Sequence, residues 1–133
     1  MDAASLALKP PTAALKAVLD ALPGGVAQVV SPPRSSVPIA ITYKLCGKMF
    51  AILAVRANEH VVLKCDPHLV EILKQQYGGV AHRTHLDRRF WIAVSLDADV
   101  PADEVARLAE GSYQLIRAGL TRKQQAELAA LAG

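Results

Sequence analysis

The fold of this chain is decided by the stretch from Ile39 to Val55, which reads IAITYKLCGKMFAILAV. In its first half, large apolar residues alternate with smaller or polar ones: Ile39, Ile41, Tyr43 and Leu45 against Ala40, Thr42 and Lys44. A period of two is typical of a strand with one buried face. Cys46-Gly47 interrupts the pattern, and residues 49–55 then continue almost without polarity. The stretch therefore predicts a β-hairpin with one well-buried arm.

The sequence on either side of this hairpin predicts two further strands and four helices. Thr12 is placed to cap a first helix that ends at Pro23-Gly24-Gly25, and Asp66-Pro67 begins a second helix. The remaining predicted elements are strands at 60–64 and 90–96, a helix at 101–119 and a terminal helix that begins with a Thr121/Gln124 capping box. Because short turns join consecutive strands, we predict an α+β fold, a twisted, mainly antiparallel sheet with helices packed on one face.

Length and composition fit one domain. The chain has 133 residues, of which 52% are apolar, enough to enclose a single hydrophobic core. We expect one domain over residues 1–133, with its core at about 12–120 and a short C-terminal helix at 121–132. Two cysteines, Cys46 and Cys65, are too few for a disulfide framework. The sequence shows neither a secretory start nor a membrane-length apolar run, so we expect a cytoplasmic protein with no membrane partner.

The positive charge of the chain is concentrated in its middle. The formal net charge is +3, and residues 34–92 hold nine lysines and arginines against four acids, a surplus of five. Such a distribution is compatible with a polyanionic partner.

The densest polar segment runs from His82 to Trp91, and two interpretations of it stay open. In the functional one, its arginines neutralise phosphates and the tryptophan stacks on a base or wedges into a groove. In the structural one, Arg88 and Arg89 are solvated edge residues and Trp91 is the main aromatic side chain of the core.

No pattern in the sequence indicates catalysis or a metal site. The nucleophile elbow, the P-loop, the dinucleotide-binding fingerprint and the HExxH motif are all missing. His82 and His85 share a local spacing, but structural zinc usually needs four ligands. We therefore expect a non-enzymatic protein without a cofactor or a metal.

Three blocks of the sequence, taken in order, resemble the MmcQ/YjbR family of small bacterial proteins. They are Gly47-Lys48-Met49-Phe50-Ala51, Leu63-Lys64-Cys65-Asp66-Pro67 and the run from His85 to Ile92. The Leu-Pro-Gly that ends the first helix and the pair Ser112-Tyr113 are also similar. Where family members often have Phe-Gly before the hairpin, this chain has a Ser/Pro segment with Arg34, and where they often have histidine before the tryptophan, it has Phe90.

The resemblance implies a frataxin-like (CyaY-like) fold and a DNA-binding protein with a double-wing arrangement. Carried over residue by residue, it gives the candidate nucleic-acid contacts Lys48, Lys64, His85, Arg88, Arg89 and Trp91. The function expected from the resemblance is binding to the phosphates of duplex DNA through a basic wing, with weak sequence preference.

Two other functions stay open. The alternative is a non-catalytic protein-interaction or oligomerisation module, in which the apolar side of the C-terminal helix forms a homo-oligomer. An iron binder related to frataxin ranks last, because the first helix offers Asp20 alone where iron recruitment needs an acidic ridge.

Overall fold

The computed structural model describes residues 8–56, 58–82 and 86–132. Along the chain these form α1 (Pro10–Asp20), β1 (Gly25–Val30), β2 (Ala40–Leu45), β3 (Lys48–Ala54), β4 (His60–Lys64), α2 (Pro67–Gln76), β5 (Val80–Ala81), β6 (Trp91–Ser95), α3 (Ala102–Ala118) and α4 (Arg122–Ala132). No helix among these residues is both long enough and apolar enough to cross a bilayer.

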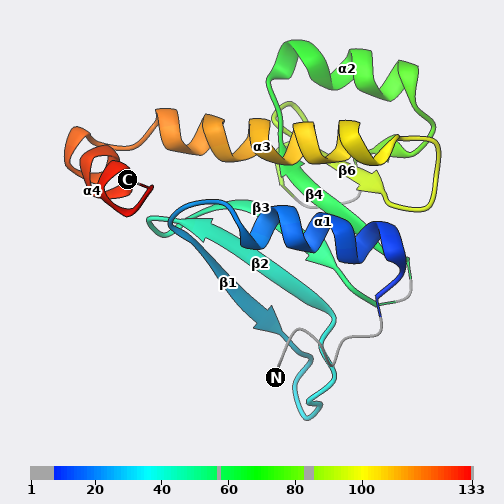
Figure 1. The fold of residues 1–133 in the computed structure, drawn as a ribbon. Helices are drawn as coiled ribbons and strands as arrows, with labels where there is room; N and C mark the ends of the chain where they lie inside the picture. The colour runs from blue at the N-terminus through cyan, green and yellow to red at the C-terminus, as the bar shows by residue number, and fades with distance from the viewer. Residues whose placement is uncertain (1–7, 57, 83–85, 133) are drawn as a thin grey trace.

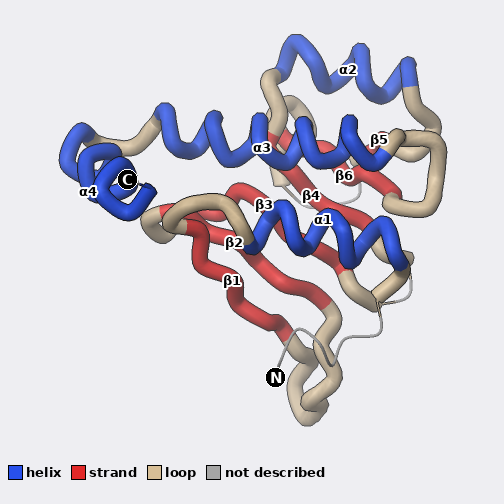
Figure 2. Tube along the Cα trace, in the orientation of Figure 1, coloured by secondary structure: helices blue, strands red, loops and turns tan. Residues whose placement is uncertain are grey.

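The strands form one sheet, covered on one face by helices. Its six strands lie in the order β1-β2-β3-β4-β6-β5, and every neighbouring pair is antiparallel. Helix α3 packs on β2, β3 and β4, and α1 lies beside α3 and reaches β1 (Figures 1 and 2). The predicted α+β fold is therefore confirmed. The edge strands β1 and β5 were not predicted.

The hairpin between β2 and β3 turns through two residues. Cys46 and Gly47 both have positive φ, 50° and 79°, between Leu45 and Lys48, which pair with each other. Positive φ at both central positions is typical of a turn whose twist matches that of the flanking strands. The predicted hairpin is confirmed, and the turn fixes which residues face the helices.

Three aromatic side chains form the centre of the core. The register of β2 and β3 shifts beside Tyr43, which leaves Phe50 as the extra residue of a bulge. The Phe50 ring is fully buried, with its centroid 5.5 Å from that of Tyr113 in an edge-to-face arrangement and 6.1 Å from that of Tyr43. The two tyrosine hydroxyls donate to Asp20 Oδ1 and to the Pro23 carbonyl, at 2.8 and 2.6 Å. These bonds fasten the end of α1 to the sheet and to α3.

Ser112 of α3 joins two strands through one hydroxyl group. Its Oγ donates to the Phe50 carbonyl at 2.6 Å and accepts from the Lys64 amide at 2.9 Å. The side chain is fully buried, and its hydroxyl finds both of its partners in backbone groups of the sheet. The Ser112-Tyr113 pair therefore holds α3 against the ends of β3 and β4.

The predicted N-cap of the first helix is wrong. Helix α1 begins at Pro10 after Lys9, and Thr12 lies inside the first turn, fully buried, with no hydrogen-bond partner for its Oγ1. Proline needs no amide partner at the start of a helix, which explains why the helix begins before the threonine.

We expect Thr12→Val to stabilise the protein by about 1 kcal/mol, because it removes a buried, unsatisfied hydroxyl at almost constant shape. Thermal unfolding should show a rise in Tm of a few degrees. Thr121→Val is the contrasting control, because Thr121 Oγ1 accepts from the Gln124 amide in the confirmed capping box and its loss should destabilise. A lower Tm for Thr12→Val would contradict this account.

Candidate nucleic-acid interface

The sheet has a second face, on which none of the described helices packs. Thr42, Ile52, Val62 and Ala93 are aligned across four strands by the register and alternate with the core residues Ile41, Leu53, Val61 and Val94. Because side chains alternate along a strand, the first set lies on the face opposite the core. We call this the helix-free face.

Two lysines and the tryptophan lie on the helix-free face at the same end of the sheet. Lys64 is directly opposite Trp91 in the β4–β6 register, so the two side chains share a face. Lys44, two residues beyond Thr42 on β2, shares it too and is exposed, whereas Lys64 and Trp91 are half-buried. With strands about 4.8 Å apart, Lys44 and Lys64 lie two strands, or about 10 Å, from each other.

Lys44 was missed by the sequence analysis, and Trp91 is not the core aromatic that the structural interpretation expected. The signal for Lys44 was present, because it alternates with Tyr43 and Leu45, whose side chains form the core. Trp91 lies outside the core cluster, where Tyr43, Phe50 and Tyr113 supply the aromatic rings.

The turn before β6 separates the two adjacent arginines. Asp87 accepts from Arg89 Nε and Nη2, at 3.1 and 2.7 Å, and also from the Arg89 amide at 2.9 Å. These hydrogen bonds lower the pKa of Asp87 to about 2, so the carboxylate stays charged at neutral pH. The Arg89 guanidinium also lies 5.2 Å from the centre of the Phe90 ring. Arg88 is exposed and forms no ion pair with any residue that the structure describes.

The other two predicted contacts lie elsewhere. Lys48 pairs with Leu45 of the core face, and its Nζ lies 3.5 Å from the Gly119 carbonyl at the end of α3. A cation there stabilises the negative end of the helix dipole. His85 lies outside the described residues. The structure therefore brings Lys64 and Trp91 together, whereas Arg88, in the turn that leads into β6, lines a hollow with Pro67, Val70 and Glu71 of α2.

A groove lies on the other side of the sheet, between α2 and α3. It encloses about 350 Å³, with Leu69, Leu108 and Leu115 on its walls, and the end of β4 reaches it through Lys64 and Cys65. Burial, and then the nearby Asp66, raise the pKa of the Cys65 thiol to about 11. The thiol is therefore neutral at physiological pH and a poor nucleophile.

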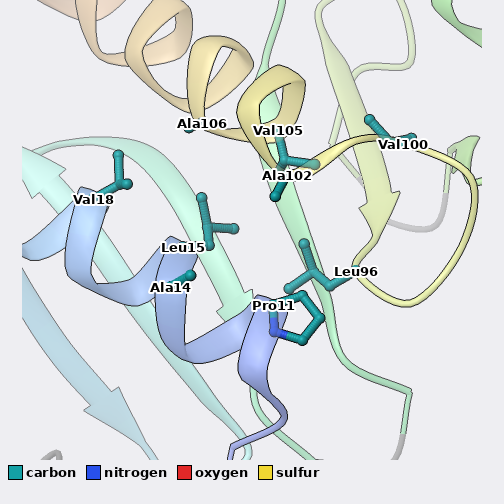
Figure 3. A pocket seen from close by; sticks show the side chains of 9 residues that line it. All are labelled: Pro11, Ala14, Leu15, Val18, Leu96, Val100, Ala102, Val105 and Ala106. Carbon is teal, nitrogen blue, oxygen red and sulfur yellow. The ribbon is translucent and has the colours of Figure 1, made fainter.

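A smaller cavity between α1 and α3 carries no polar side chain. It encloses about 80 Å³ and is lined by Pro11, Ala14, Leu15, Val18, Leu96, Val100, Ala102, Val105 and Ala106 (Figure 3). Such a lining offers no group for acid–base or metal chemistry. In the described part of the chain, no cluster of three or more His, Cys, Asp or Glu residues could hold a metal ion.

Comparison with known proteins identifies relatives in sequence and in fold. The YjbR family model matches residues 21–115, from the end of α1 into α3. The curated "Uncharacterized protein YjbR" of Escherichia coli K12 is 36% identical over 76 residues, which cover 56% of this chain and 64% of that protein. The same description and values hold for the protein of Escherichia coli O157:H7.

Solved structures share the architecture. The crystal structure of Deinococcus radiodurans protein DR2400, described with the family-model domain DUF419, has a TM-score of 0.75 and 29% identity, with 92% of each chain covered. A Pseudomonas syringae protein has a TM-score of 0.55 and 24% identity, over 67% of this chain and 86% of the other, a likeness of fold alone.

Proposed function

The chain belongs to the YjbR family. From this premise and the surface described above, we propose that it is a non-catalytic, cytoplasmic protein that binds the phosphates of duplex DNA. The proposed site consists of Lys44, Lys64 and Trp91 on the helix-free face and of Arg88 in the adjoining turn beside α2. We call these four residues the cation row.

The observation that carries the proposal is that three cations share one end of the sheet and have no acidic partner among the described residues. Lys44, Lys64 and Arg88 form none of the ion pairs found among the described residues. The acid next to Arg88 along the chain, Asp87, is already held by Arg89. Free cations neutralise phosphates and release condensed counterions, which is the main source of sequence-independent DNA affinity.

The chemistry of the row favours weak sequence preference. Lysine is a flexible point charge, and phosphate contacts orient a protein on DNA without reading its sequence. A span of about 10 Å between Lys44 and Lys64 is similar to the width of the major groove. The half-buried Trp91 offers an apolar surface beside the cations, suited to sugar and backbone contact.

The test is the anisotropy of a fluorescent 25-mer duplex over a series of salt concentrations. Three phosphate contacts predict a slope of log K against log salt of about −3, so affinity should fall roughly 40-fold between ~50 and ~200 mM salt. A single strand of the same length serves as the comparison and should bind with a shallower slope. If the duplex does not bind at ~50 mM salt, the proposal is overturned. If the single strand binds more tightly than the duplex, the ligand is single-stranded DNA and the proposal of duplex binding is wrong.

A further inference from the structure

The outer edge of β1 differs from most sheet edges because nothing in its sequence protects it. Edge strands are usually short, charged, bulged or interrupted by proline, since their free backbone groups invite pairing. β1 has six residues in unbroken register with β2, and the chain carries no charge from Ala21 to Pro33. The opposite edge, β5, has only two residues and is contacted by α2.

Exposed apolar side chains gather along the β1 edge. Eight large apolar side chains are exposed among the described residues, and four of them belong to β1 or to the loop that leads into β2, namely Val26, Val29, Val37 and Ile39. Val26 is 65% exposed and Val29 43%, and alternation places them on opposite faces of the strand. The Ile39 amide donates to the Val30 carbonyl at 2.9 Å, which holds this loop against the end of β1.

The hydrogen bonds of β1 show which backbone groups point away from β2. Thr42 Oγ1 donates to the Gln28 carbonyl at 3.3 Å, so that carbonyl points toward β2. Because carbonyl directions alternate along a strand, the amide and carbonyl groups of Ala27 and Val29 point to the outer edge. They form the template for one more strand.

We propose that β1 pairs antiparallel with β1 of a second copy of this chain, joining two six-stranded sheets into one continuous sheet. An antiparallel strand pair of identical sequence is self-complementary and closes as a two-fold dimer. The uncharged edge suits a second copy, because two chains of net charge +3 meet there without repulsion between facing side chains. This interface lies on the sheet edge, next to the cation row, because Val26 is the register partner of Lys44.

The test combines sedimentation with amide hydrogen exchange on the full chain. We expect a monomer–dimer equilibrium over ~10 µM to ~1 mM protein, which corresponds to a weak association. The Ala27 and Val29 amides should exchange more slowly as the dimer forms. Val26→Lys adds a charge to the edge, and Ala27→Pro removes an outward N–H that β2 does not use; each should weaken dimerisation at least about tenfold.

Ile72→Lys is the matched control, because Ile72 is a similarly exposed apolar residue, 54%, on α2. It should dimerise like the unchanged protein. If the protein without any substitution stays monomeric at ~1 mM, the proposal is overturned. So would a dimer that persists in both β1 variants, since its interface would then lie elsewhere.

Discussion

Replacing Phe50 by alanine is expected to lower the free energy of unfolding by about 3–5 kcal/mol. The side chain is fully buried, and its ring contacts those of Tyr43 and Tyr113. The substitution removes the favourable free energy of burying a large apolar side chain, and it leaves a cavity that the surrounding sheet cannot close. Since domains of this size are stable by only about 5–15 kcal/mol, this one change should consume a large part of the total.

Urea denaturation followed by circular dichroism measures this effect, with the m-value as a check on two-state behaviour. Leu69→Ala is the control, because Leu69 is an aliphatic side chain that is 45% exposed, and it should cost much less. A loss below about 1 kcal/mol for Phe50→Ala would show that the bulge relaxes and that the aromatic cluster is not the centre of the core.

Alternation and turn chemistry made the middle of the fold predictable. The β2–β3 hairpin, the Asp66 cap and the Thr121/Gln124 capping box all depend on neighbours in sequence, and all three are confirmed. The sequence did not predict β1, and the reason is physical. An edge strand exposed on both faces needs no alternation, so Gly-Val-Ala-Gln-Val-Val shows none.

The composition of the candidate site was less predictable than the fold. Arg88 and Arg89 are adjacent and chemically alike, yet only one of them folds back on Asp87, and the turn geometry decides which. Lys48 follows a glycine turn and looks like an exposed wing residue, but register places it beside the end of α3. These distinctions depend on three-dimensional neighbours that no local pattern encodes.

Several residues that carry the family resemblance have structural roles in this fold. Gly47 supplies positive φ at the hairpin, Phe50 fills the core, and Ser112 bridges β3 and β4. Similarity at such positions reports a shared architecture rather than a shared ligand. Evidence for DNA binding must therefore come from residues that the fold does not need, and Lys44 and Arg88 are of that kind.

The triple variant Lys44→Gln/Lys64→Gln/Arg88→Gln should reduce duplex affinity about a thousandfold at ~50 mM salt, because each phosphate contact is worth roughly tenfold there. The slope of log K against log salt should move from about −3 toward zero. Glutamine keeps most of the side-chain length, and none of the three side chains belongs to the core, so the variant should fold. Thermal unfolding of the triple variant checks this point separately from binding.

The decisive comparison is a second triple variant with the same net charge. Arg56→Gln/Arg107→Gln/Lys123→Gln removes three exposed cations from a turn at the other end of the sheet, from α3 and from α4. If the position of the charges matters, this control should lose far less affinity and keep most of the slope. Equal losses in the two variants would mean that DNA senses only the overall charge of the chain, because long-range attraction is indifferent to where the cations lie. The cation row would then not be the DNA-binding site.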